Sequence, residues 1–206
     1  MLIDMHTHML SKRWMDLLAS HGGPRLAVTK TSQGRTCIAQ DGAPFMTPMP
    51  GHFDLGLRIE HMDRWKIDLA ILSLTCPNVY FGDSETSRRA AQLSNEDMAD
   101  AQAQHPDRLR WLASLPWEHP EAAVAELARA RADGAIGVMV LANINGRPLT
   151  DPAFAPVWAA IDAAALPVLI HPAAPGCGTN GPAASRFDRR CRLHDGYNAG
   201  LRADLL

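Results

Sequence analysis

The sequence predicts an α/β protein built on a parallel sheet, and three observations lead to this class. Short apolar runs of the length of buried strands alternate along the chain with longer segments in which apolar residues have helical spacing. Strands that alternate with helices need crossover connections, which are right-handed and leave neighbouring strands parallel. No G-x-G-x-x-G motif follows the first strand, which argues against a dinucleotide-binding fold.

The first third of the chain supplies two of the expected strands. Residues 2–8 are a short apolar run that ends in His-x-His, and Ser11 is placed to cap a short helix over residues 11–20. Residues 55–65 have apolar side chains at helical spacing and predict a second helix. The β-rich apolar run over residues 68–75 follows directly and has the length of a buried parallel strand.

The remaining part of the pattern repeats the alternation three times. Each expected helix carries a start or stop signal, such as a proline in its first turn, an aspartate N-cap, or Pro or Asp-Gly after its end. The expected helices span residues 84–105, 120–131 and 151–165, and the expected strands span residues 109–115, 135–141 and 167–172.

Residues 25–53 interrupt this regular order. They hold many Gly, Pro, Thr and Gln residues around two short β-like pieces, residues 25–29 and 35–38. We expect an excursion or a small hairpin rather than part of the core. An insertion after the first strand can form a lid over an active site.

Composition excludes several classes of protein. The chain is 47% hydrophobic and 20% charged with a formal net charge of -2, so it has no strong field for nucleic acid or an anionic membrane. It shows neither a signal-peptide pattern at its start nor an apolar run long enough to span a bilayer, and a cytoplasmic location is therefore the default expectation. Its four cysteines form no C-x-x-C pair, which argues against a disulfide framework or a zinc ribbon.

Three histidines at strand ends are the candidate metal ligands. Side chains of a strand alternate between its faces, so His6 and His8 point the same way, and His171 ends the fifth expected strand. In a (β/α)8 barrel the C-terminal ends of all strands open onto one axial cavity, where active sites lie. The fold class that this placement favours is a TIM-barrel-like sheet of which about five βα units are present, a partial barrel. Three imidazoles in its cavity suit a divalent ion such as Zn²⁺.

Three stretches of the chain together resemble the amidohydrolase superfamily, in the branch called amidohydrolase family 2, which includes aminocarboxymuconate semialdehyde decarboxylase and γ-resorcylate decarboxylase. They are Asp4–His8, Arg58–Asp68 and Val168–Pro172, and the resemblance covers about residues 2–175. It implies a distorted (β/α)8 barrel with one catalytic divalent ion, commonly zinc and alternatively manganese. It also implies that His6, His8 and His171 are metal ligands.

The resemblance implies a reaction as well. The favoured function is non-oxidative decarboxylation of a small aromatic or unsaturated carboxylic acid, and the alternative is metal-dependent hydrolysis of an ester, lactone or amide. Many relatives dimerise, so a homodimer is expected, with neither nucleic acid nor a membrane as partner.

A third interpretation is an inactive, truncated barrel fragment. The family's catalytic histidine after the sixth strand and its aspartate ligand after the eighth have no matching position in this chain. Residues 1–175 read as the N-terminal part of the barrel. Residues 176–206 form an atypical tail with five Arg against three Asp, which suggests a disordered segment or a truncated or frame-shifted reading of a longer gene.

Candidate substrate-binding residues are Arg58, Asn143 and Arg147. Either arginine could bind a carboxylate in bidentate fashion, and Asn143 follows the fourth expected strand on the face where substrate would lie. For Arg58 an ion pair on the helix surface with Glu60 or Asp63 is the preferred interpretation. The catalytic acid or base is not assigned.

Overall fold

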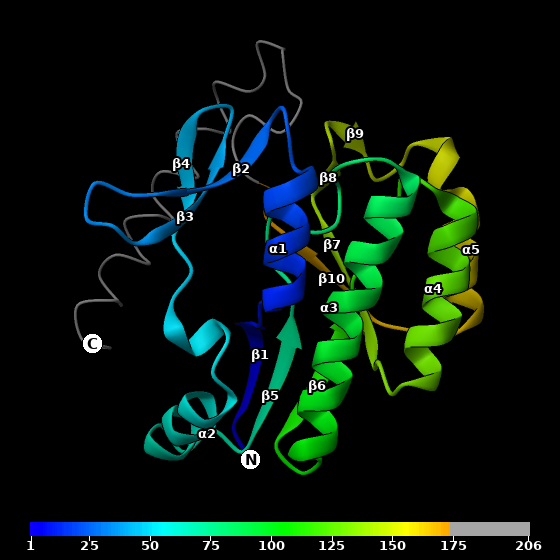
Figure 1. The fold of residues 1–206 in the computed structure, drawn as a ribbon. Helices are drawn as coiled ribbons and strands as arrows, with labels where there is room; N and C mark the ends of the chain where they lie inside the picture. The colour runs from blue at the N-terminus through cyan, green and yellow to red at the C-terminus, as the bar shows by residue number, and fades with distance from the viewer. Residues whose placement is uncertain (174–206) are drawn as a thin grey trace.

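Five parallel strands form the central sheet of the computed structural model, which describes residues 1–173 (Figure 1). Their order in space follows their order in the chain, and each neighbouring pair is parallel. The predicted α/β class and its five parallel strands are confirmed. The strands are β1 (Ile3–His8), β5 (Leu69–Ser73), β6 (Leu109–Ala113), β7 (Gly137–Leu141) and β10 (Val168–His171).

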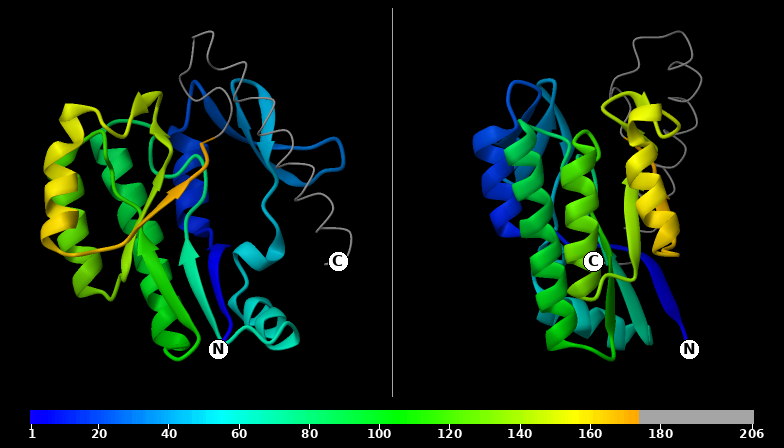
Figure 2. Two further views of the ribbon diagram at one scale, coloured as in Figure 1. Left: turned by 180° about the vertical axis from the view of Figure 1, so that it is seen from behind. Right: turned by 90° about the vertical axis from the view of Figure 1, so that its right-hand side faces the viewer.

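The helices that link these strands form an outer layer against the sheet (Figures 1 and 2). α1, α3, α4 and α5 pack side by side in that order. Ser11 caps α1 as predicted, by accepting a hydrogen bond from the backbone N–H of Trp14. The helices are α1 (Lys12–His21), α2 (Leu55–Arg64), α3 (Ser84–Gln104), α4 (Pro120–Ala132) and α5 (Ala155–Ala163), with 3-10 turns η1 (Pro50–His52) and η2 (Pro152–Phe154).

The segment after α1 contains more structure than the sequence suggests. It forms a three-stranded antiparallel sheet of β2 (Leu26–Lys30), β3 (Thr36–Gln40) and β4 (Ala43–Met46). The last of these strands contains Pro44 and pairs with β3 across an irregular register, as expected of an edge strand. The prediction of a small hairpin is therefore too short by one strand.

A second hairpin lies after β7. The two-residue strands β8 (Asn143–Ile144) and β9 (Arg147–Pro148) pair across Asn145-Gly146, both of which have positive φ angles, 48° and 85°. Asn-Gly is the pair favoured in such tight turns. The helix expected over residues 151–165 begins beyond this hairpin, and it is divided into η2 and α5.

The core lies between the sheet and the helices. Trp111 is fully buried on β6, and Trp158 packs against the core while its indole N–H donates to the Leu149 carbonyl over 2.8 Å. None of the helices in residues 1–173 is long and apolar enough to cross a membrane.

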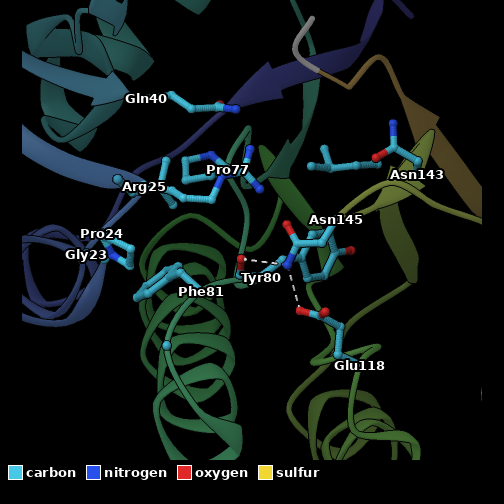
Figure 3. Close-up of a pocket in the computed structure, with 14 residues that line it drawn as sticks. Gly23, Pro24, Arg25, Gln40, Pro77, Tyr80, Phe81, Glu118, Asn143 and Asn145 are labelled. Atoms are coloured by element: carbon cyan, nitrogen blue, oxygen red, sulfur yellow. Dashed lines mark hydrogen bonds between the residues drawn. The ribbon is translucent and has the colours of Figure 1, made fainter. Parts of the chain in front are cut away.

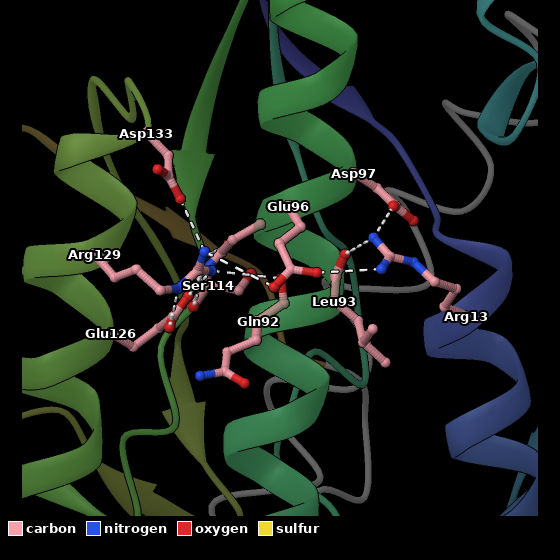
Figure 4. Close-up of polar contacts among 10 residues, drawn as sticks. Arg13, Gln92, Leu93, Glu96, Asp97, Ser114, Glu126, Arg129 and Asp133 are labelled. Atoms are coloured by element: carbon pink, nitrogen blue, oxygen red, sulfur yellow. Dashed lines mark hydrogen bonds and ion pairs between the residues drawn. The ribbon is translucent and has the colours of Figure 1, made fainter.

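Polar contacts cross the helix layer as well (Figure 4). The buried Asn95 of α3 holds both backbone groups of Ser114, accepting from its N–H over 2.9 Å and donating to its carbonyl over 3.0 Å. Its amide also donates to Glu126 of α4 over 2.6 Å, and that carboxylate accepts from Arg129. This network fixes α3 and α4 to the chain at the end of β6.

Candidate metal centre

His6, His8 and His171 meet at the C-terminal ends of the two edge strands of the sheet, β1 and β10. The Nε2 atom of His8 lies 3.1 Å from Nε2 of His6 and 3.1 Å from Nε2 of His171. One ligand nitrogen from each ring lies within 4.8 Å of the other two. The curled sheet thus brings together three imidazoles that are separated by up to 165 positions in the sequence, counted from 6 to 171.

Neighbouring groups turn the ring nitrogens of His8 and His171 toward this centre. Nδ1 of His171 lies 2.7 Å from the Pro172 carbonyl, which can only accept, so Nδ1 carries the hydrogen. The lone pair of the neutral ring is then on Nε2. His8 is opposite Ser73 in the sheet, and the Ser73 hydroxyl lies 3.2 Å from its Nδ1. Both contacts leave Nε2 for a metal ion.

Burial favours the neutral form of two of the rings. It lowers the pKa of His8 to about 3, and the adjacent His171 and His6 add to this effect. Burial also lowers the pKa of His171, against the opposing effect of the Pro172 carbonyl. Neutral imidazole is the form that binds metal ions.

The three nitrogens fit a divalent ion. Nitrogen ligands at about 2.0–2.1 Å in a tetrahedral zinc site lie roughly 3.3–3.4 Å from one another. The two 3.1 Å separations at His8 are close to this spacing, so small ring rotations would place an ion between the nitrogens. The donor set and its geometry therefore suit the metal that the sequence predicts.

The side chain of Asp4 does not reach a ligand imidazole. Its carboxylate accepts a hydrogen bond from the backbone N–H of His6 over 3.0 Å. The pairing of β1 with β5 shifts register between Asp4 and Thr7, so a strict alternation of faces does not hold along this strand. Asp4 therefore holds the backbone of His6 and contacts no ligand imidazole among the residues that the structure describes.

Arg58 does not form the surface ion pair that the sequence favours. It is 8% exposed, and its guanidinium donates to the Thr7 hydroxyl and to the backbone carbonyls of His8 and Gly51. The preferred surface ion pair is wrong, because the side chain turns inward; Asp63 instead pairs with Arg108 at 2.8 Å. A substrate carboxylate would have to compete with these protein acceptors for Arg58.

Arg147 is also engaged by the protein. Its Nε and Nη2 contact the two carboxylate oxygens of Asp151, at 3.0 Å and 2.9 Å, and its guanidinium carbon lies 4.7 Å from the centre of the Phe154 ring. A substrate carboxylate would have to displace Asp151. Asn143 is half-buried, and its side-chain oxygen accepts from the N–H of Gly146 over 2.9 Å, which leaves its amide hydrogens for a ligand.

A pocket of about 230 Å³ lies between the β2–β4 sheet and the loops after β5, β6 and β7 (Figure 3). Asn143 and Asn145 line one side, and Arg25 and Gln40 line another. The amide of Asn145 donates to Glu118 over 2.8 Å and to the Tyr80 carbonyl over 3.2 Å. Leu141 also lines the pocket, and it pairs with His171 in the sheet.

Two residues at this site were not found from the sequence. Ser73 contacts His8 only because β1 and β5 pair in this register. Cys76 donates its thiol hydrogen to the Pro172 carbonyl over 3.4 Å, which links the loop after β5 to the end of β10. Ser73 lies near the C-terminal end of the strand expected over residues 68–75 and is the last residue of β5, and this position is the one signal that could have indicated it.

A parallel α/β sheet with three histidines at the C-terminal ends of its strands is the arrangement expected of a metal-dependent enzyme of the barrel type. Comparison with known proteins agrees with this class. The profile of the amidohydrolase family matches residues 3–196, so the chain belongs to the amidohydrolase family. The match extends past residue 175; the predicted tail, residues 176–206, lies outside the described residues.

Three relatives illustrate the similarity. The 2-amino-3-carboxymuconate-6-semialdehyde decarboxylase of Dictyostelium discoideum is 29% identical over 174 residues, 82% of this chain and 48% of that protein. The γ-resorcylate decarboxylase of Rhodococcus jostii (strain RHA1) is 33% identical over 130 residues, 58% of this chain and 40% of that protein.

The third relative is a solved structure. The 5-carboxyvanillate decarboxylase of Novosphingobium aromaticivorans, complexed with manganese and 4-hydroxy-3-methoxy-5-nitrobenzoic acid, is 25% identical with a TM-score of 0.66. The similarity covers 84% of this chain and 50% of that one. The chain thus spans about half the length of the relatives it matches, or somewhat less.

Proposed function

We propose that this protein is a metal-dependent, non-oxidative decarboxylase of a small aromatic or unsaturated carboxylic acid. The observation that carries the proposal is the convergence of His6, His8 and His171, with Nε2 separations of 3.1 Å at His8. The relatives support the reaction, because all three are named decarboxylases. The alternative reaction is metal-dependent hydrolysis of an ester, lactone or amide, and no contact in the site favours it.

The proposed cofactor is one divalent ion held by His6, His8 and His171. Zinc suits a three-histidine site. Manganese is the alternative, and it is the metal in the structure of the carboxyvanillate relative. When bound, such an ion supplies a Lewis acid that orients an oxygen ligand and stabilises negative charge.

The residues of this chain would hold the acid at the metal centre. Asn143 is proposed to donate its amide hydrogens to the substrate in the pocket that Leu141, the sheet neighbour of His171, also lines. A cavity of about 230 Å³ favours a single-ring or short unsaturated acid over a large ligand. Arg147 is a second candidate for the carboxylate if the substrate displaces Asp151. In the reaction the bond to the carboxylate breaks, CO₂ leaves, and the carbon that keeps the electron pair takes a proton.

A release assay tests this proposal. The full chain, loaded with Mn²⁺ or Zn²⁺, is incubated with γ-resorcylate, 5-carboxyvanillate and 2-amino-3-carboxymuconate 6-semialdehyde, and CO₂ is measured. We expect release from at least one acid, loss of that release with a chelator, and loss in His171→Ala, which removes one of the three rings. His61→Ala, an exposed histidine of α2, is the control that should keep the activity.

Two other outcomes would contradict the decarboxylase. Hydrolysis of a panel of esters, lactones and amides without CO₂ release would indicate the hydrolase. A folded, metal-loaded chain that is inactive on both panels would indicate a fragment without catalytic activity.

We further propose that the protein acts in the cytoplasm as a homodimer, without nucleic acid or membrane partners. The net charge of -2 supports the absence of polyanion binding. Apolar side chains on both edge strands support association, since Met5 and Ile170 are each 56% exposed. Light scattering after gel filtration is expected to give twice the mass of the chain, and a stable monomer at micromolar concentration would contradict the dimer.

A further inference from the structure

Arg58 contacts the C-terminal end of β1, where the His-x-His motif lies. It belongs to α2 and reaches the strand at Thr7, the residue that lies between His6 and His8 in the chain. Its Nη1 donates to the Thr7 hydroxyl over 2.6 Å, and its Nη2 donates to the His8 carbonyl over 2.5 Å. One guanidinium thus binds two consecutive residues of the ligand-bearing strand.

The same guanidinium joins this strand end to the next turn. Nη2 of Arg58 also donates to the Gly51 carbonyl of η1 over 2.9 Å. Two backbone hydrogen bonds run beside it, from the Leu10 N–H to the His52 carbonyl and from the Met9 N–H to the Ser73 carbonyl. Hydrogen bonds to Arg58, His52 and Ser73 therefore fix the chain where it leaves the sheet after His8.

Arg58 makes no ion pair among the residues that the structure describes, although the negative charge of Asp4 acts on it from a distance. Its three acceptors are a hydroxyl and two carbonyls, and burying a cation in this way is costly unless its hydrogen bonds are well formed. A buried apolar side chain would pack α2 against the strand at lower cost. What arginine adds is a planar fork whose donors have fixed directions.

We infer that Arg58 is a positioning residue that sets the spacing and direction of the His6 and His8 imidazoles for the metal ion. The inference rests on the proposed metal centre. It gives Arg58 a role through the strand, since its guanidinium contacts the Thr7 hydroxyl and the His8 carbonyl and no imidazole.

Three variants of the full chain test this role. Arg58→Lys keeps the positive charge and loses the planar fork, and Thr7→Val removes one acceptor at nearly constant shape. Arg108→Lys is the matched control. Arg108 also donates to two backbone carbonyls, those of Ile67 and Asp68, but these lie before the N-terminal end of β5, at the end of the sheet away from the histidines.

Two measurements are made on each variant. Titration calorimetry gives the dissociation constant of Mn²⁺ and of Zn²⁺. Hydrogen exchange of the metal-free chain, followed by mass spectrometry, gives the protection of the peptide that covers residues 3–9. The second measurement needs no metal, so it separates the role of Arg58 from the existence of the metal centre.

We expect Arg58→Lys to weaken metal binding by about 10- to 100-fold, as for other groups that orient metal ligands, and Thr7→Val to weaken it less. Exchange of residues 3–9 should quicken in Arg58→Lys, and Arg108→Lys should match the wild type in both measurements. Equal losses in Arg58→Lys and Arg108→Lys would overturn the inference, and so would unchanged binding and exchange in Arg58→Lys. If the wild type binds neither ion, the proposed function fails, and faster exchange in Arg58→Lys would still support its hold on the strand end.

Discussion

His8→Ala is expected to weaken the binding of Zn²⁺ or Mn²⁺ by more than about 100-fold, because it removes the central ligand of a three-nitrogen site. The Nε2 atom of His8 is the one that lies 3.1 Å from Nε2 of both other rings. Its loss leaves two imidazoles on opposite edge strands. Titration calorimetry of the metal-free chain measures this change directly.

The effect on metal binding should exceed any effect on folding. His8 is the last residue of β1, and its ring packs mainly against the other two histidines. We therefore expect His8→Ala to stay folded, with a circular dichroism spectrum close to that of the wild type. His61→Ala serves as the control with unchanged affinity, since His61 is exposed on α2. Wild-type affinity in a folded His8→Ala chain would place the metal elsewhere.

Trp111→Ala is expected to lower the free energy of unfolding by about 3–5 kcal/mol, as for other large aromatic residues removed from a core. Trp111 is fully buried on β6, the middle strand of the sheet. Removing its indole leaves a cavity that the neighbouring strands cannot close without losing their pairing. Urea denaturation followed by circular dichroism gives the difference.

A tryptophan outside the core provides the comparison. Trp65 ends α2 and is 50% exposed, so Trp65→Ala should change the stability by no more than about 0.5 kcal/mol. Similar losses in the two variants would contradict the core that the structure shows.

The sequence predicted most of the central sheet because its signals are local. Apolar runs, caps and prolines mark each of the five strands and the helices between them, and helix α3 ends one residue before its predicted end. The missed elements are short. β4 contains a proline, and β8 and β9 have two residues each, so no periodicity could develop.

The convergence of the three histidines could be predicted for a different reason. The period of two along β1 places His6 and His8 together, and the topology of a barrel places His171 at the same end of the sheet. The surroundings of these ligands could not be predicted, because they depend on contacts between distant segments. Arg58 and Thr7 are 51 positions apart, and Ser73 and His8 are 65 apart.

X-ray absorption spectroscopy of the zinc-loaded chain tests the central claim, that His6, His8 and His171 form one metal site. The spectrum counts the imidazoles around the ion and measures their distances. The account predicts three imidazole nitrogens at about 2.0–2.1 Å, and two in His171→Ala. A zinc ion with only water and carboxylate oxygens around it, or one whose imidazole count is unchanged in His171→Ala, would contradict it.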